Sequence, residues 1–415
     1  MTQTAYRAQL LTFREDPVHA ANGVVYKADG LLIFEDGKVV AAGAYASIRD
    51  RLAADATVHT MRDKLIVPGF IDSHIHYSQT DIIASPAPGL LSWLNTYTFP
   101  TEHGFENPAV ARETASFFID ELLAYGTTTA LVYCTVHKQS ADAFFTESES
   151  RNLRMVAGKV LMDRNCPEFL RDTAQAGYDD SDELIARWHG RGRQQYALTP
   201  RFAPTSTKAQ LEACGVLAQK HQDVFIQSHV AENADEIKWV ESLFPGHRSY
   251  LDIYDHYGLL RRRAMYGHCI YLDDADRQRM AETGAVASHC PTSNLFLGAA
   301  CSISRRLARP TCRWHWRRTS AAARMFWLAT TGAAQVLELD NKIGTLAAGS
   351  EADFVVLDPY ATPLLARRTS RTESLEELLF AFALLGDDRA VFETYAAGKR
   401  VHSRERNTAV LKLAA

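Results

Sequence analysis

The sequence predicts an α/β protein built around a (β/α)₈ barrel, and three observations support this fold class. From Val67 onward, short apolar runs alternate with helical segments, as in repeating βα units. Seven strands of this kind can be counted before residue 291, so the eighth strand stays in doubt. Four histidines stand at strand ends, and parallel barrels carry their active sites at the carboxyl ends of the strands. We therefore expect a site at that end of the barrel.

The expected elements follow in order along the chain. Residues 6–66 carry short strands and turns, with Asp36-Gly37 as a hairpin signal. The barrel begins with the apolar run from Val67 to His76, which only Pro68 and Gly69 interrupt. Further barrel strands are expected at 127–134, 153–161, 195–200, 224–228, 264–267 and 285–290, with helices between them, for example at 108–125, 182–189, 207–221 and 273–282. Short strands return at 354–357, 390–392 and 397–401.

The composition is that of a soluble enzyme and argues against a nucleic-acid-binding, a membrane or a secreted protein. The 415 residues are 47% hydrophobic, which allows a large core, and the net charge of −4 favours neither a nucleic-acid nor a membrane surface. The chain has no apolar stretch of transmembrane length and no signal-peptide core at its N-terminus. Its seven cysteines form no C-x-x-C pair and indicate reduced thiols, so a cytoplasmic location is expected.

The four strand-end histidines indicate a metal site. His74 and His76 stand two positions apart, and such side chains point to the same side of a strand. His229 and His268 follow the apolar runs 224–228 and 264–267. One such histidine is more often a buried structural residue, but four in the same setting are better explained by a metal ion. Imidazole suits zinc, iron or nickel, and an open coordination position would hold a water of lowered pKa.

Several segments resemble a known family. The segments 67–76 (VPGFIDSHIH), 228–232 (SHVAE) and 266–269 (YGHC) resemble the amidohydrolase superfamily, as does the closing stretch 343–354. More specific segments resemble its guanine deaminase branch: 92–102 (SWLNTYTFPTE), 199–205 (TPRFAPT) and 288–294 (SHCPTSN). The resemblance covers nearly the whole chain except residues 299–323.

The resemblance implies an activity, the hydrolytic deamination of guanine to xanthine and ammonia, in which a metal-bound hydroxide attacks C2 of the purine. It also implies a metal site, one zinc ion per chain with iron as the alternative, held by His74, His76, His229 and His268. Glu232 matches the carboxylate that carries a proton from the water to the ring nitrogen beside C2, and His268 is counted with it among the catalytic residues. A carboxylate in the first turn of a helix is the structural alternative for Glu232.

The resemblance further implies which residues bind the substrate. Gln79 and Arg201 match the residues that read the polar edges of the purine, and an arginine fork suits a planar ligand. Phe202 and Trp93 are candidates for stacking on the ring, although a place in the core is the alternative for Trp93. A small-molecule purine is the expected partner, and a homodimer is the expected assembly.

The resemblance divides the chain into two domains. The barrel is expected at residues 67–352, and residues 1–66 plus 353–415 are expected to form a small β-sandwich beside it.

One expected residue is missing. The superfamily places a metal-binding Asp on its last barrel strand, but no Asp or Glu occurs between Gly298 and Arg324. Arginines on both faces would also make residues 311–319 a poor buried strand. The genetic code permits Ala-Leu-Ala-Thr-Asp-Val-Gly-Gly-Gly when residues 314–323 are read in a shifted frame. We therefore predict a frameshift joined to a deletion at about 299–323, which would leave the chain feebly active at best.

Two alternative functions stay open. One is deamination or hydrolysis of another heterocycle, such as an oxidised purine, a pterin or an s-triazine. The other is a catalytically impaired homologue that has lost the barrel Asp but still folds and binds a purine.

Overall fold

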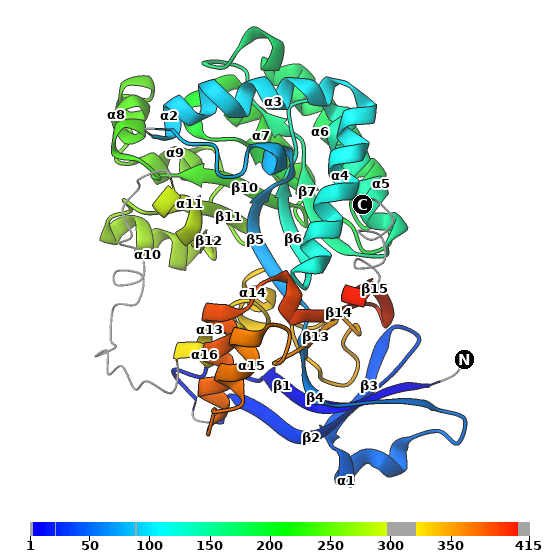
Figure 1. Ribbon diagram of the computed structural model, residues 1–415. Helices are drawn as coiled ribbons and strands as arrows, with labels where there is room; N and C mark the ends of the chain where they lie inside the picture. Colours follow the sequence, from blue (N-terminus) through cyan, green and yellow to red (C-terminus); the bar gives the residue numbers. More distant parts are fainter. Residues whose placement is uncertain (1–2, 21, 88, 297–320, 406–415) are drawn as a thin grey trace.

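The computed structural model of the chain describes residues 3–20, 22–87, 89–296 and 321–405 (Figure 1). The stretch 299–323, for which a frameshift is predicted, lies outside the described residues except for positions 321–323. The frameshift therefore stays a prediction.

The barrel is confirmed, with seven parallel strand positions in the order β12-β11-β10-β9-β7-β6-β5. No eighth strand closes it among the described residues, and Ser73 of β5 contacts Ser288 of β12 at 2.5 Å between their hydroxyl oxygens. The strands are β5 (Phe70–His76), β6 (Thr127–Tyr133), β7 (Arg154–Gly158), β9 (Gln195–Pro200), β10 (Phe225–Val230), β11 (Ala264–His268) and β12 (Val286–Ser288), while β8 (Val160–Leu161) prolongs β7 and pairs with β9.

Helices lie around this sheet and in the loops at its carboxyl end (Figure 1). One expected helix, 182–189, is wrong in length, because the helix begins already at Ala174 after a Thr173 cap. Gly177 resembles a helix breaker in the sequence, but it packs closely against Leu161. The helices are α2 (Leu90–Trp93), α3 (Phe99–His103), α4 (Pro108–Ala124), α5 (Lys138–Ser150), α6 (Ala174–Trp188), α7 (Lys208–Lys220), α8 (Ala234–Leu243), α9 (Tyr250–His256), α10 (Asp274–Thr283) and α11 (Pro291–Phe296).

The two chain ends form a second, mixed sheet with the strand order β15-β14-β13-β4-β1-β2-β3. The expected hairpin at Asp36-Gly37 joins β2 to β3, and both residues have positive φ. The strands are β1 (Thr4–Phe13), β2 (Val24–Glu35), β3 (Lys38–Ala44), β4 (Thr57–Pro68), β13 (Phe354–Leu357), β14 (Val391–Ala396) and β15 (Lys399–Ser403). The expectation of only short strands is wrong for β1, β2 and β4, which span ten to twelve residues.

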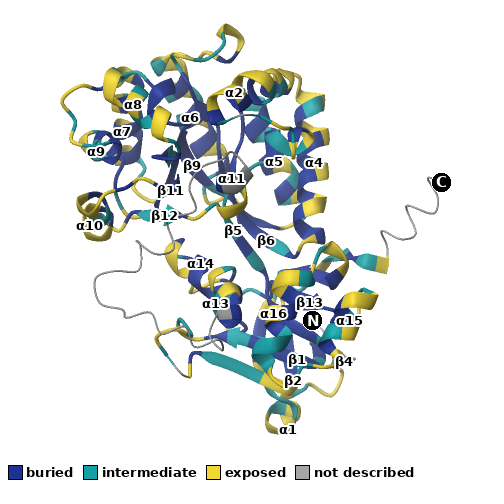
Figure 2. Cartoon of the chain, turned by 60° about the vertical axis from the view of Figure 1, so that its left-hand side comes forward, coloured by how far each residue is buried: buried dark blue, intermediate teal, exposed yellow. Residues whose placement is uncertain are grey.

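The sequence did not predict the helices α13 (Ala321–Leu328), α14 (Thr331–Val336), α15 (Pro363–Thr369) and α16 (Leu375–Leu385). Helices α13, α15 and α16 pack on this terminal sheet, whereas Ala333 and Ala334 of α14 pack against barrel-strand residues such as Ile71 and Leu131. Apolar residues of α13, α15 and α16 share a buried cluster with strands of the sheet (Figure 2). No described helix is long and apolar enough to cross a membrane.

The junction of the two sheets positions the site. Strand β4 of the terminal sheet runs through Gly69 directly into β5 of the barrel. A Cβ at Gly69 would collide with the side chain of Thr128, so only glycine allows this crossing. Strand β5 then carries His74 and His76 to the carboxyl end of the barrel.

Candidate active site

The structure brings the four predicted histidines together at the carboxyl ends of β5, β10 and β11. The His74 ring centroid lies 5.4 Å from that of His76, 4.7 Å from that of His229 and 5.2 Å from that of His268. The Nε2 atoms of His76 and His229 are 3.0 Å apart. One ligand atom from each of His74, His76 and His229 falls within 4.8 Å of the others. This arrangement can accommodate one cation.

Neighbouring groups decide which ring nitrogens face the centre. His229 Nδ1 lies 2.7 Å from the carbonyl oxygen of Arg201, to which it donates, so its Nε2 is left as a ligand. His268 Nδ1 lies 2.8 Å from Asn294 Oδ1 and has the same arrangement. Such outer contacts orient metal-binding histidines.

The charge state of the histidines also fits a metal. Burial lowers the pKa of His74, His76 and His229 well below the usual range, and neighbouring imidazoles lower it further. Neutral imidazoles are the form that binds metals. Within the described part of the chain, the buried His76 Nδ1 has no hydrogen-bond partner. The donor set of this cluster therefore suits a divalent cation.

The backbone around the cluster is unusual in ways that place its side chains. Ala231, His268 and Cys269 all have positive φ, a conformation that costs energy for residues other than glycine. Gly267 lies so close to His74 that a Cβ there would lie 2.7 Å from His74 Nδ1. The His74 ring therefore packs directly on the backbone of β11.

Glu232 lies beside the histidines in a buried position. Its Oε2 is 3.4 Å from His268 Nε2, and its Oε1 has no hydrogen-bond partner among the described residues. Burial raises the pKa of Glu232 to about 8, although Arg201 opposes the shift. The backbone N–H groups of Glu232 and Asn233 both donate to Glu236, whose carboxylate closes a capping box on α8. The expected alternative, a carboxylate in the first helical turn, therefore describes Glu236 better than Glu232.

Arg201 is buried at the end of β9 and is held by Glu102. Arg201 Nη1 donates to both carboxylate oxygens of Glu102, at 2.9 and 2.8 Å. Burial raises the pKa of Glu102, and the charge of Arg201 counteracts this rise. Gln79 lies in the short helical turn Tyr77–Ile82 that follows the metal-site strand.

The two candidate stacking residues share an apolar cluster. Trp93 and Phe202 are both buried there, with 7% and 4% of their surfaces exposed. Phe202 pairs with His229 through a β-bridge, so its backbone is adjacent to the histidine cluster. Its ring makes an edge contact with Trp239.

Four residues of the site were not assigned roles from the sequence. Tyr133, at the end of β6, stacks on the His76 ring at 4.3 Å between centroids and touches His74 and His229. The others are Glu102, Glu236 and Asn294. The segments 92–102 and 288–294 contain Glu102 and Asn294, so their motifs were the available signal, but the pairings depend on long-range contacts.

Comparison with known proteins identifies relatives of the chain. The model of the Amidohydrolase family matches residues 65–309 and 306–401. The guanine deaminase of Escherichia coli K12 is 42% identical over 94% of this chain and 95% of its own length. A solved structure of E. coli guanine deaminase, 40% identical in sequence, superposes with a TM-score of 0.90 over 97% of this chain and 100% of that chain. Guanine deaminase from Bradyrhizobium japonicum gives a TM-score of 0.91 at 31% identity, over 97% of this chain and 100% of its own.

Proposed function

The chain belongs to the amidohydrolase family and, within it, to the guanine deaminases, and on this basis we propose that it hydrolyses guanine to xanthine and ammonia. One observation carries the proposal: four neutral histidines, one protonatable carboxyl group and a braced arginine meet at one end of the barrel. This combination suits the hydrolytic removal of an amino group from a planar, polar ring.

The histidine cluster is the proposed site of a divalent cation, with zinc as the first choice and iron as the second. When bound, the cation would lower the pKa of a water molecule so that a nucleophile exists near neutral pH. His74, His76, His229 and His268 are the residues that would hold it. Metal dependence is typical of the family.

Glu232 is the proposed proton carrier. A carboxyl group whose pKa is raised to about 8 is protonated near neutral pH. It can give a proton to the ring nitrogen beside C2, take one from the attacking water and deliver it to the departing amine. The remaining proton of the water, on the C2 hydroxyl, then returns to the carboxylate as the C2 carbonyl forms, so one water is consumed, one ammonia is released and Glu232 is protonated again. His268, 3.4 Å from Glu232, keeps this carboxyl group oriented and is proposed as its catalytic partner.

Arg201 is proposed to form hydrogen bonds with one polar edge of the purine. Among the described residues its side-chain hydrogen bonds use only Nη1, and Glu102 accepts them. Nε and Nη2 then form the fork for a carbonyl oxygen and a ring nitrogen. Gln79 is proposed to bind a second polar edge, and Phe202 and Trp93 to bound the apolar faces of the ring.

The test is an assay of the purified, zinc-supplemented chain with guanine, following xanthine formation and ammonia release together. A panel containing adenine, a pterin and an s-triazine runs in parallel. Guanine turnover supports the proposal, while ammonia from another ring alone would favour the other heterocycle.

A specific observation favours a second candidate, the catalytically impaired homologue. Residues 297–320 contain no Asp or Glu, so this stretch has no carboxylate to give the cation. Guanine binding without ammonia release, by a folded and zinc-loaded chain, would identify this case. Sequencing the gene over codons 295–330 would separate a true protein sequence from a shifted frame.

The assembly and location follow from the same family membership. We propose a homodimer that acts in the cytoplasm, with a free purine as its small-molecule partner. Sedimentation of the purified chain tests the first of these expectations.

A further inference from the structure

The cysteine that follows β12 lies next to the histidine cluster. Cys290 stands two residues after the strand ends and directly precedes α11. One ligand atom from each of His74, His268 and Cys290 lies within 4.8 Å of the others. Ligand atoms around a tetrahedral zinc ion are about 3.3–3.8 Å apart, so a movement of about 1 Å would complete the set.

Hydrogen bonds connect the segment around Cys290 to the histidine cluster. The Asn294 backbone N–H donates to the Cys290 carbonyl at 2.9 Å, and the Asn294 side chain orients His268. Cys290 and its histidine partner are therefore coupled through one helical turn. The Cys290 thiol makes a weak contact, at 3.5 Å, with the carbonyl of Ser288.

A divalent cation at the histidine cluster needs an anionic ligand, and Cys290 can supply one as a thiolate. The four histidines bring no negative charge to a divalent cation, because imidazole binds a metal as the neutral ring. Residues 297–320 offer none either, because they contain no acidic residue. Asp72 accepts a hydrogen bond from the His74 backbone at 2.9 Å. A thiolate is a strong ligand for zinc and cobalt, and zinc sites of mixed histidine and cysteine are common.

We propose that Cys290 is a metal ligand in this chain together with His74 and His268, and that its thiolate supplies the anionic charge of the site. The inference rests on the proposed function only in assuming that the histidine cluster binds a divalent cation. A proton leaves the Cys290 thiol for solvent as the metal–sulfur bond forms, so metal uptake releases one proton per site.

Cobalt substitution tests the proposal without any assay of turnover. The chain loaded with one equivalent of Co²⁺ should show a sulfur-to-cobalt charge-transfer band in the near ultraviolet. Cys290→Ser should abolish the band and weaken cobalt binding at least about 10-fold. Zinc X-ray absorption should show one sulfur at about 2.3 Å in the unaltered chain and none in the variant.

Matched cysteine variants serve as controls. Cys269→Ser changes a buried thiol beside His268, and a joint Cys301→Ser and Cys312→Ser variant removes the thiols of the 297–320 stretch; both should keep the band. Cys290→Asp should bind cobalt without the band, which shows that the position still folds and ligates.

The outcomes separate this inference from the proposed function. Cobalt bound without a sulfur band would overturn the role of Cys290 and leave the histidine site intact. A band that survives in Cys290→Ser but not in the joint variant would overturn it as well. No cobalt binding at all would remove both the inference and the metal on which the proposed function depends.

Discussion

Outer contacts hold the side chains that we propose to take part in the reaction. Glu102 binds Arg201, the backbone N–H of Glu232 donates to the Glu236 carboxylate, and Asn294 orients His268. Pre-organisation of this kind is what catalysis by positioned groups requires. Single substitutions at this scale should therefore separate chemistry from binding.

Glu232→Gln should lower kcat/KM for guanine by about 10²–10⁴-fold, because the amide cannot carry a proton. Zinc content measured by atomic emission should stay that of the unaltered chain. Glu241→Gln makes the same change on the exposed face of α8 and should have no effect on either quantity. Unreduced turnover in Glu232→Gln would remove this residue from the mechanism.

Arg201→Lys should raise the free energy of the transition state by about 2–4 kcal/mol, seen in kcat/KM, because lysine keeps the charge but loses the fork. The charge left beside buried Glu102 should keep the fold, which a thermal melt checks. If kcat/KM does not change, Arg201 does not contact the substrate.

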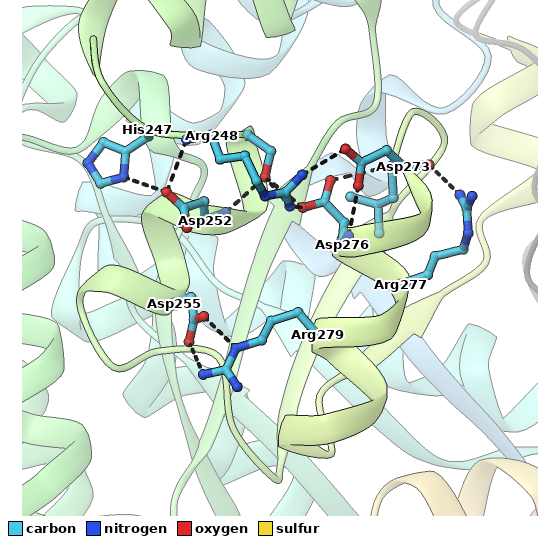
Figure 3. Close-up of polar contacts among 10 residues, drawn as sticks. His247, Arg248, Asp252, Asp255, Asp273, Asp276, Arg277 and Arg279 are labelled. Atoms are coloured by element: carbon cyan, nitrogen blue, oxygen red, sulfur yellow. Dashed lines mark hydrogen bonds and ion pairs between the residues drawn. The ribbon is translucent and has the colours of Figure 1, made fainter.

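At the scale of elements, ion pairs connect the helices that precede and follow β11. Arg248 binds Asp273 at 2.7 Å and also pairs with Asp276, and Arg279 binds Asp255 at 2.6 Å (Figure 3). These contacts connect α9, which precedes β11, with α10, which follows it. Because β11 ends at His268, the network anchors the strand that carries one histidine of the cluster.

Asp276→Ala should destabilise the chain by about 2–4 kcal/mol, because it removes both a helix cap and the buried partner of Arg248. Urea unfolding measures the change. The matched control is Asp274→Ala on the same helix turn, where the side chain is fully exposed and the expected change is within about 0.5 kcal/mol. Equal losses in the two variants would contradict the assignment.

At the scale of the whole molecule, a buried ion network joins the barrel to the terminal sheet. Arg154 of β7 and Arg193, which precedes β9, both bind Glu351, at 2.8 and 2.6 Å, and Arg193 also pairs with Asp353. Glu351 and Asp353 lie just before β13 of the terminal sheet. Although burial raises the pKa of Glu351, its bonds to Arg154 and the charge of Arg193 outweigh this and lower it.

The lowered pKa predicts how stability depends on pH. A carboxyl group with a depressed folded-state pKa stabilises the fold above its ordinary value, about 4.3, and loses this contribution as the pH falls through the folded-state pKa. Glu351→Gln should therefore cost about 2 kcal/mol near pH 7, less than for a fully buried pair. The difference from the unaltered chain should shrink below about pH 4. Urea unfolding at a series of pH values measures it, and a difference that grows with acid would contradict the prediction.

The sequence alone determined the fold class and the positions of most barrel strands, because each strand is a short apolar run whose periodicity is local. Strand β9 and strand β13 have the bounds that the pattern predicts, and the histidines at strand ends converge because parallel strands all end at one face. The helices after residue 360 were not predicted, since Pro363 and the following short apolar runs resemble the strands beside them.

Only the tertiary structure decided which side chains meet. Glu102 and Arg201 are 99 positions apart, and Arg193 reaches Asp353 across 160 positions. Cys290 joins the histidines because β11 and β12 lie side by side in the sheet. Such pairs leave no periodic trace in the chain, because packing of distant elements sets their distances. The sequence therefore determined what chemistry this protein carries, and the folded barrel decided which groups share it.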